Sequence, residues 1–447
     1  MSGDPMTGSA LRAALKSRSI ERGVVLGANG TMGFGSAALF TQAIPEVTFL
    51  ARTREKAEEG LQGAISQVRS PTVASRARCG SYDEDLDASL EQADFIFEAL
   101  TEDFGIKKQM FDRVEKARHK DSIVGTVTSG LSINGLCEGR DESFRRNFLG
   151  LHLFNPPNVI VGTELVCNQD TDPEVADFVE AFSRLRLGRE IIRTADTPAF
   201  AGNRVGFKVL NEAAQLVEDL GPALVDQIIG PYTGRALTPL ATVDLVGWDI
   251  HRAIVDNVYQ NTSDEAHASN RMPDYMARLI EQGVLGNKSG AGFFKRDGKT
   301  RLALDPRSGD YTPVAELNLP DLPFIAEIST LYREGRYRDG MALFLAAEGD
   351  EARIAKKVVA GYISYAFHRV GEVTETLNGI DRIMGTGFNW APPGVLVDLM
   401  GPAAACEMIA AADVPVPAAL ETAAKSGTTE PFFHHPTISR GKFLVAS

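Results

Sequence analysis

The stretch GVVLGANGTMG, residues 23–33, decides the fold class of this 447-residue chain. A short apolar run leads into a turn whose glycines are three positions apart: Gly27, Gly30 and Gly33. A helix-like segment over residues 36–40 follows, and then a second apolar run over residues 47–50. A strand, a glycine turn, a helix and a second strand in this order are typical of a βαβ unit.

Working outward from this unit, the sequence predicts an α/β domain followed by helical structure. Apolar runs at residues 95–97, 123–127 and 148–154 alternate with charged, helix-like segments. Such alternation indicates a Rossmann-type, doubly wound parallel sheet. From residue 199 onward apolar residues recur at the helical period, for example over residues 203–220, and strand-like runs become rare.

The helical part contains an internal repeat. The string DQIIG at residues 226–230 returns as DRIMG at 381–385, and VDLVG at 243–247 returns as VDLMG at 397–401. Two copies of one helical domain explain these identities in a common register. Chance similarity between amphipathic helices is the alternative.

These patterns predict six segments along the chain. In order they are a flexible N-terminal arm (1–20), a dinucleotide-binding domain (21–196), a first helical domain (197–295), a linker (296–350), a second helical domain (351–425) and a peripheral tail (426–447).

Composition restricts the function further. The net charge of −13 disfavours nucleic-acid binding, because an acidic chain repels the phosphodiester backbone. The four cysteines are widely separated, so neither a disulfide framework nor a metal site is expected. Since no run of 18 apolar residues occurs, we expect a cytoplasmic protein that does not enter the membrane.

The glycine turn is the candidate phosphate-binding loop, because a pyrophosphate can approach a backbone without side chains at a helix N-terminus. The usual motif is G-x-G-x-x-G, with one residue between the first two glycines. Here the spacing is G-x-x-G-x-x-G, with two residues between them. NAD is usually read by a carboxylate at the end of the second strand, but Ala51 stands there, followed by Arg52 and Arg54. Guanidinium groups pair well with a 2′-phosphate. The cofactor is therefore either NADP, or NAD bound without the carboxylate.

His152 is the candidate catalytic base. It lies in GLHLFNPP, residues 150–157, where an apolar strand meets a rigid turn, and Glu164 follows within the next apolar run. A carboxylate that binds one imidazole nitrogen fixes the tautomer and stabilises the imidazolium, so the other nitrogen can take a proton. A buried structural histidine is the alternative.

Taken together, the motifs resemble those of the 3-hydroxyacyl-CoA dehydrogenase family over roughly residues 20 to 420. The similar strings are residues 30–33, 98–103 with Lys107, 128–131, 150–156, 196–204 and 286–294. The doubled helical unit resembles the dehydrogenase part of bifunctional fatty-acid oxidation proteins.

The resemblance implies oxidation of an L-3-hydroxyacyl-CoA to a 3-oxoacyl-CoA, with His152 as general base and Glu164 as its partner. Ser129 and Asn203 match the residues that hydrogen-bond the substrate oxygen and the histidine. A turn residue and a helix N-cap, respectively, are the alternatives for these two. The residues implied in cofactor binding are Gly27, Asn29, Gly30, Thr31, Met32, Gly33, Ala51, Arg52, Arg54, Ala99, Glu102 and Lys107.

The implied partners are an acyl-CoA substrate and, in the same pathway, an enoyl-CoA hydratase and a thiolase as separate proteins. A homodimer is possible, although the second helical copy could replace such a contact within one chain. Two alternative functions stay open: a dehydrogenase of a non-CoA hydroxy acid on the same scaffold, and a non-catalytic structural member of the family.

Overall fold

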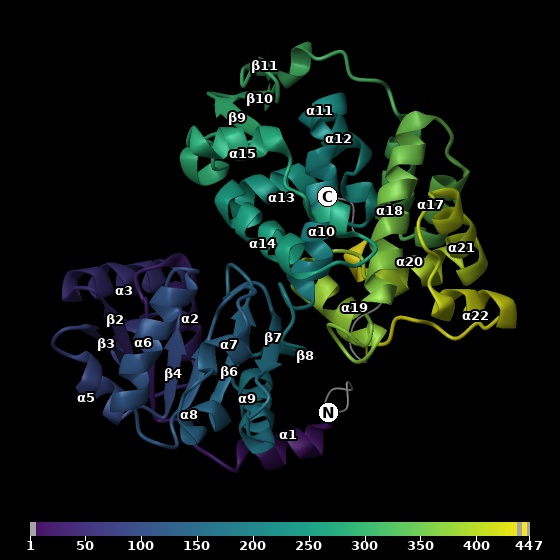
Figure 1. Ribbon diagram of the computed structural model, residues 1–447. Helices are drawn as coiled ribbons and strands as arrows, with labels where there is room; N and C mark the ends of the chain where they lie inside the picture. Colours follow the sequence, from purple (N-terminus) through teal and green to yellow (C-terminus); the bar gives the residue numbers. More distant parts are fainter. Residues whose placement is uncertain (1–5, 436–439, 445–447) are drawn as a thin grey trace. The chain divides into compact units, whose positions relative to one another are not determined.

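The computed structural model describes residues 6–435 and 440–444, and the chain forms two compact units. The first unit comprises Met1–Ala201 with Glu372–Glu375, and the second comprises Gly202–Gly371 with Thr376–Ser447 (Figure 1). Each unit is described by itself below.

The first unit is built on one eight-stranded sheet with the order β3-β2-β1-β4-β5-β6-β7-β8. Neighbouring strands are parallel except β6 and β7, which are antiparallel. The strands are β1 (Arg22–Leu26), β2 (Glu46–Ala51), β3 (Ala77–Ser81), β4 (Phe95–Glu98), β5 (Ile123–Thr126), β6 (Phe148–Leu153), β7 (Gly162–Cys167) and β8 (Glu190–Thr194). The predicted Rossmann-type domain is confirmed, and its sheet is mixed rather than wholly parallel.

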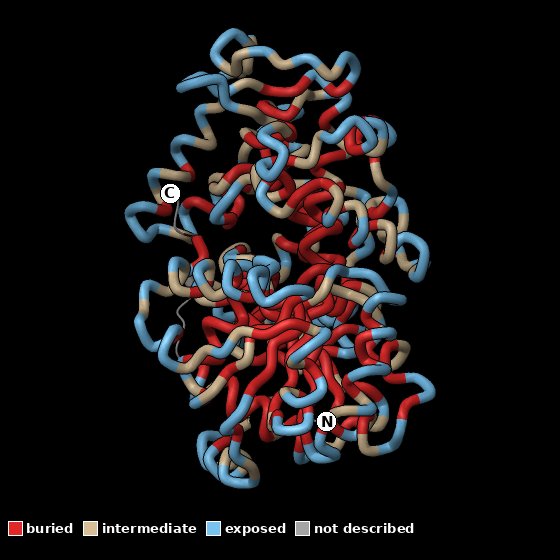
Figure 2. Tube along the Cα trace, turned by 90° about the vertical axis from the view of Figure 1, so that its left-hand side faces the viewer, coloured by how far each residue is buried: buried red, intermediate tan, exposed pale blue. Residues whose placement is uncertain are grey.

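Helices cover both faces of this sheet, because alternate strand residues point to opposite sides. Val25 packs with α2, α3 and α9, whereas Val24 and Leu26 pack with α5 to α8. Figure 2 shows the buried residues following the strands. The helices of the unit are α1 (Gly8–Leu15), α2 (Thr31–Phe40), α3 (Arg54–Val68), α4 (Pro71–Arg76), α5 (Leu86–Glu91), α6 (Phe104–Ala117), α7 (Ile133–Cys137), α8 (Glu142–Arg146) and α9 (Pro173–Leu185).

The N-terminal segment differs from the flexible arm expected over residues 1–20. Helix α1 begins after Thr7, whose hydroxyl accepts a hydrogen bond from the Ala10 amide, and it packs against α9 with Leu11 buried. Leu15 also packs against the core of the unit, so two leucines anchor this short helix. Residues 1–5 lie outside the described part.

The second unit is mainly helical, as predicted from residue 199 onward. Its helices up to residue 281 are α10 (Gly202–Gln215), α11 (Val217–Leu220), α12 (Pro222–Ile228), α13 (Pro239–Val246), α14 (Trp248–Asn261) and α15 (Asp274–Glu281). The later ones are α16 (Pro323–Arg333), α17 (Tyr337–Ala346), α18 (Asp350–His368), α19 (Leu377–Thr386), α20 (Pro393–Met400), α21 (Pro402–Ala411) and α22 (Ala418–Ser426).

The segment predicted as a linker, residues 296–350, contains regular secondary structure. It contains most of a three-stranded antiparallel sheet, formed by β9 (Phe294–Asp297), β10 (Thr300–Leu304) and β11 (Tyr311–Pro313), and then helices α16 and α17. Cation–aromatic contacts hold the sheet: the Arg301 guanidinium lies 3.7 Å from the Phe294 ring centroid, and the Lys295 ammonium lies 4.1 Å from that of Tyr311. Charged residues at these positions hid the alternation that identifies strands.

The repeated strings occupy equivalent hydrogen-bonding positions. Asp226 accepts from the amide of Leu240, and Asp381 accepts from the amide of Gly394. In both cases a buried carboxylate near the end of one helix binds the N-terminal turn of a later helix.

The second aspartate of each repeat binds a pair of phenylalanine amides. Asp244 accepts from the amides of residues 293–294, and Asp398 accepts from those of residues 432–433. The predicted tail, residues 426–447, is therefore attached to the helical core at residues 432–433 rather than peripheral there. Residues 436–439 and 445–447 lie outside the described part.

No single helix in the described ranges 6–435 and 440–444 has both the length and the apolarity to cross a membrane. The pair α20 and α21 meets the criterion only when the two are taken together, and the chain bends by 107° between them.

Asp381 predicts a pH-dependent difference in stability. Its Oδ2 is buried without a hydrogen-bond partner, whereas Asp226 has the Thr238 hydroxyl as an additional donor. Pro392 occupies the position corresponding to Thr238 and has no such hydroxyl. Burial raises the pKa of Asp381 well above its ordinary value and that of Asp226 to about 6.

Because the pKa of Asp381 is raised in the folded protein, the unfolded chain releases this proton at lower pH than the folded protein does, so the carboxyl lowers wild-type stability as pH rises. Asp381→Asn removes that slope. In urea unfolding at increasing pH from about 5 upward, we expect the variant to become progressively more stable relative to wild type, because it has no buried carboxyl whose pKa is raised by folding. For Asp226→Asn the relative gain should level off near pH 6. A pH-independent difference for Asp381→Asn would contradict the assignment.

Candidate active site

The glycine turn between β1 and α2 is shaped by close backbone approaches. A Cβ atom on Gly27, whose φ is +79°, would lie 2.5 Å from the carbonyl oxygen of Ala99. A Cβ atom on Gly33 would lie 2.0 Å from the carbonyl oxygen of Gly27. These two positions therefore require glycine for packing. At Gly30 the nearest atom would be 3.6 Å away, an ordinary van der Waals distance, so this position does not require glycine for packing.

The exposed start of α2 is suited to a phosphate group. Gly30 is the N-cap of α2, and no side chain caps the helix there. Asn29, Gly30 and Thr31 are exposed. Because the first amides of a helix carry partial positive charge and lack partners within the helix, this turn can hold the pyrophosphate of a dinucleotide. Gly33 is buried and Met32 half-buried in the first turn of α2, where they support the loop.

Arg52 and Arg54, which follow β2, differ in their contacts. Ala51 is buried at the end of β2. The Arg54 guanidinium donates to the carbonyl of Cys79 and pairs with Asp85 at 3.1 Å. Arg52 is exposed and, among the described residues, makes no hydrogen bond or ion pair. Of the two arginines, Arg52 is the one whose charge is available to a ligand.

Tyr82 also belongs to this region, although its sequence context gave no signal. Its amide donates to the carbonyl of Ala51, and its hydroxyl oxygen accepts from the amide of Gly27 at 2.8 Å. Burial raises the pKa of the Tyr82 phenol to about 12. The neutral phenol thus joins the end of β3 to the start of the glycine turn.

A buried ion pair fixes the loop after β4. The Lys107 ammonium lies 2.7 and 3.0 Å from the two carboxylate oxygens of Glu98, and both side chains are fully excluded from solvent. Glu98 also accepts from the Leu100 amide and the Thr126 hydroxyl. The ammonium of Lys107 is therefore neutralised inside the fold, which the motif alone did not indicate.

The same network positions the candidate serine. Glu102, whose Oε2 lies 3.5 Å from the Lys107 ammonium, accepts through Oε1 from the Thr128 hydroxyl and the Ser129 amide. The loops that follow β4 and β5 are thereby joined at the carboxyl edge of the sheet. In open α/β sheets this edge is where ligands bind.

The histidine and glutamate meet across a hairpin. In the antiparallel register of β6 and β7, His152 lies directly opposite Glu164. Their side chains bond at 2.6 Å between Nδ1 and Oε2, and both are almost wholly buried. With Nδ1 held by the carboxylate, Nε2 is the nitrogen left to exchange a proton with a substrate.

Aromatic rings surround the imidazole. The centroid of the Phe154 ring lies 4.7 Å from that of His152, and the centroid of Phe200 lies 5.8 Å away. The second oxygen of Glu164, Oε1, accepts from the amide of Ala201 at 2.9 Å. Both carboxylate oxygens are thus hydrogen-bonded in an apolar surrounding, as a buried charge requires.

Asn203 lies in the second unit, near the start of α10, and is buried. Of the four predicted catalytic residues, the first unit contains His152, Glu164 and Ser129.

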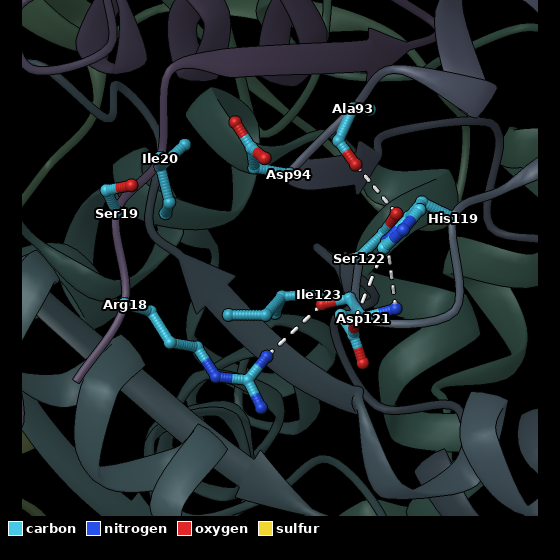
Figure 3. Close-up of a pocket in the computed structure, with 9 residues that line it drawn as sticks. All are labelled: Arg18, Ser19, Ile20, Ala93, Asp94, His119, Asp121, Ser122 and Ile123. Carbon is cyan, nitrogen blue, oxygen red and sulfur yellow. Dashed lines mark hydrogen bonds and ion pairs between the residues drawn. The ribbon is translucent and has the colours of Figure 1, made fainter.

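A cavity of about 370 Å³ lies away from the His–Glu pair, at the amino ends of β4 and β5 (Figure 3). Its polar groups serve the fold: Asp94 accepts from the amides of residues 21–22, and the Ser122 hydroxyl donates to the carbonyl of Ala93. Because ligands of such sheets bind at the carboxyl edge, this cavity is not the cofactor site.

A glycine turn at a helix N-terminus, together with a buried His–Glu pair on the same sheet, is typical of nucleotide-dependent dehydrogenases. Comparison with known families agrees with this class. Residues 23–197 match the model of the 3-hydroxyacyl-CoA dehydrogenase NAD binding domain, and residues 200–296 match that of the C-terminal domain of the same family. The chain belongs to the 3-hydroxyacyl-CoA dehydrogenase family. The matched domain indicates a nicotinamide cofactor.

Two curated relatives illustrate the similarity. A probable 3-hydroxyacyl-CoA dehydrogenase of Bacillus subtilis is 30% identical over 400 residues, which cover 83% of this chain and 50% of the relative. One of the same description from Deinococcus radiodurans is 31% identical over 293 residues, covering 62% of this chain and 83% of the relative. The chain thus spans about half the length of the first of these relatives.

Solved structures show the same fold. FadB2 of M. tuberculosis is 27% identical with a TM-score of 0.54, covering 63% of this chain and all of that one. The 3-hydroxybutyryl-CoA dehydrogenase of Escherichia coli has a TM-score of 0.68 at 20% identity, and covers 92% of this chain and all of that one.

The Glu98–Lys107 pair supplies a stability prediction. Lys107→Met leaves the Glu98 carboxylate buried without its counter-ion, which should lower the free energy of unfolding by about 3–5 kcal/mol. The double variant Glu98→Gln/Lys107→Met removes both charges and should recover most of this loss. Urea unfolding measures all three proteins. If the single variant were as stable as wild type, the pair would not hold the loop as described.

Proposed function

We propose that this chain is an L-3-hydroxyacyl-CoA dehydrogenase, which oxidises the 3-hydroxyl of an acyl-CoA thioester reversibly to a 3-oxo group. The observation that carries the proposal is the 2.6 Å bond between His152 Nδ1 and Glu164 Oε2 at the carboxyl edge of a dinucleotide-binding sheet. The descriptions of the curated relatives support the same activity.

The imidazole of His152 acts as the general base. Glu164 holds Nδ1, so the tautomer presents Nε2 as the proton acceptor for the 3-hydroxyl. As that proton moves to Nε2, the carboxylate stabilises the imidazolium that forms. The rings of Phe154 and Phe200 exclude water around the pair, which strengthens this interaction.

For the substrate oxygen we propose the Ser129 hydroxyl as a donor in this mechanism, and for Asn203 the role that the family resemblance implies. A hydroxyl and an amide can donate to the oxygen as it changes from alcohol to carbonyl. The bonds of Glu102 to the loop around Ser129 keep that hydroxyl in place while the proton moves.

A nicotinamide cofactor, when bound, would supply the acceptor for the hydride that leaves C3 of the substrate. The N-terminal turn of α2 would hold its pyrophosphate, although the Gly30 amide itself donates to the Gly27 carbonyl; the backbone around Ala99 lies beside the glycine turn. Glu102 and Lys107 support this part of the site through their own network.

We further propose that Arg52 reads the 2′ position of the cofactor and allows NADP to bind. A carboxylate at the end of β2 would repel a 2′-phosphate, but Ala51 stands there instead. Arg52 makes no ion pair within the described part of the chain. Arg54, by contrast, is paired with Asp85. A guanidinium is well suited to a phosphate because it can donate two parallel hydrogen bonds.

We also propose that the helical part arose by duplication of one domain, the second copy being predicted over residues 351–425. The matching bonds of Asp226 and Asp381, and of Asp244 and Asp398, support it. The second copy on this basis extends to residue 433, because the amides that bind Asp398 lie at 432–433.

A contact inside the second unit supports the same proposal. The offset of 155 residues that relates Asp226 to Asp381 also relates Arg235 to Trp390. These two residues form an antiparallel bridge, with the Arg235 guanidinium 4.7 Å from the Trp390 ring centroid. In an isologous interface equivalent residues near the two-fold axis meet one another, so the two copies make within one chain the kind of contact a homodimer makes.

The substrate proposal is tested by a spectrophotometric assay. The wild-type chain should reduce NAD or NADP with L-3-hydroxybutyryl-CoA, and should oxidise the reduced cofactor with acetoacetyl-CoA. Activity only with free 3-hydroxybutyrate would favour a dehydrogenase of non-CoA hydroxy acids, and absence of activity with every substrate would favour a structural role.

His152→Gln should lower kcat by at least about 100-fold, because it removes the base while leaving the glycine turn intact. Cofactor affinity, measured by fluorescence titration with the reduced nucleotide, should stay within about twofold. His119→Gln is the matched control, since His119 is exposed at the opposite edge of the sheet. Loss of nucleotide binding in His152→Gln would mean that the residue is structural.

Arg52→Asp should shift the preference toward NAD by at least about tenfold in the ratio of kcat/KM for NADP and NAD, since a carboxylate accepts from a ribose 2′-OH and repels a phosphate. Arg54→Gln, which removes a charge already paired with Asp85, should leave the ratio within about twofold. An unchanged ratio in Arg52→Asp would show that Arg52 does not read this position.

A further inference from the structure

Asp196 follows β8 and binds a loop from a distant part of the first unit. Its Oδ1 accepts from the amide of Ile133 at 2.8 Å. Its Oδ2 accepts from the Ser132 hydroxyl at 2.9 Å and from the amide and side chain of Asn134 at 2.8 and 2.7 Å. One carboxylate thus gathers four donors from three consecutive residues.

The chain directly after Asp196 adopts an unfavourable backbone conformation. Ala199 and Phe200 have φ values of +62° and +53°, in the left-handed region that residues with a Cβ avoid. Both are completely buried. Two consecutive residues of this kind persist only where the surrounding structure enforces them, and such segments cluster at functional sites.

This strained turn delivers two groups to the His–Glu pair. The Phe200 ring lies 5.8 Å from the His152 ring between centroids, and the next amide, that of Ala201, donates to Glu164 Oε1 at 2.9 Å. A standard turn would aim the ring and the amide elsewhere, so the strain is the condition for this hydrogen bond.

The loop that Asp196 binds continues the segment that carries the candidate serine. Ser129 lies three residues before Ser132, and Glu102 binds its amide from the other side. The Thr128 hydroxyl in turn accepts from the Leu131 amide, which closes the loop. Asp196 is therefore attached both to the serine loop and, through the strained turn, to the carboxylate that orients His152.

We propose that Asp196 is a positioning residue that enforces the strained turn 197–201 and thereby keeps the Glu164 carboxylate hydrogen-bonded while it holds the serine loop in register. The four hydrogen bonds to the Asp196 carboxylate stabilise the segment by more than the unfavourable backbone conformation of Ala199 and Phe200 costs. The inference rests on the proposed dehydrogenase function for its kinetic consequence, but not for its structural one.

The test is Asp196→Asn. An amide has one acceptor oxygen in place of two and turns a donor toward Ser132 and Asn134, so most of the four bonds are lost. The kcat for L-3-hydroxybutyryl-CoA should fall about 10- to 100-fold with KM for the cofactor unchanged, because small displacements at a reacting centre have effects of this size.

The pH dependence separates positioning from simple support. Without the Ala201 amide, Glu164 loses a hydrogen-bond donor and its hold on the imidazole changes, so the pH profile of kcat/KM should differ from that of wild type. Hydrogen–deuterium exchange at residues 197–202 should accelerate at the same time. This second measurement needs no activity, so it also applies if the wild-type chain fails to oxidise hydroxyacyl-CoA.

Asp172→Asn is the matched control. Asp172 is likewise a half-buried aspartate that binds a helix start in the same unit, accepting from the Glu174 amide at the N-terminus of α9. It should cause a comparable loss of stability, with the pH profile and the exchange of residues 197–202 unchanged.

A second variant separates positioning from a general loss of stability in Asp196→Asn. Ala199→Gly relieves the backbone conformation, since glycine occupies positive φ without strain. Added to Asp196→Asn, it should restore kcat at least about threefold. Equal effects of Asp196→Asn and Asp172→Asn on kcat, pH profile and exchange, or no rescue by Ala199→Gly, would overturn the proposal.

Discussion

The antiparallel pairing of β6 with β7 is the constraint on which the rest of the site depends. It reverses the direction of an otherwise parallel sheet and thereby brings His152 opposite Glu164. A carboxylate buried at that place needs donors on both oxygens, and the imidazole supplies only one. The second comes from the amide of Ala201, so the chain after β8 must return to this point in an unfavourable conformation.

Electrostatics explains how a chain of net charge −13 can bind anionic ligands. The cations that the motifs suggested for this purpose are largely used inside the fold, since Lys107 neutralises Glu98 and Arg54 pairs with Asp85. The attraction for a pyrophosphate therefore comes from the main-chain amides at the start of α2 rather than from lysine. Arg52 is the exposed charge left at the end of β2, where the proposed role would let it influence the choice of cofactor.

Local patterns predicted the parts of the structure that depend on local interactions. The glycine turn, the apolar strands and the helical segments can each be recognised from a short stretch of sequence. His152 and Glu164 are close in sequence as well, and a short hairpin brings them together. The bonds of Asp196 could not be predicted, because its partners lie 62 to 64 residues earlier and no motif links them. Tyr82 was missed for the same reason, as its hydroxyl meets Gly27 across two strands. The small sheet β9–β11 escaped because its cation–aromatic pairs look like solvated charges in sequence.

Under the proposed duplication, the two helical copies have separate tasks. At the offset of 155 residues, Asn203 corresponds to Val358, a buried residue of α18, so the second copy does not repeat the candidate substrate-binding amide. What it does repeat are the aspartate bonds that hold helices together and the surface that meets the first copy at Arg235 and Trp390. The burial that lowers the Arg235 pKa to about 10 is sustained by the aromatic rings that cover it. A duplicated domain freed from chemistry can thus be kept for its interface, because the apolar surface that the two copies share would otherwise be exposed to water.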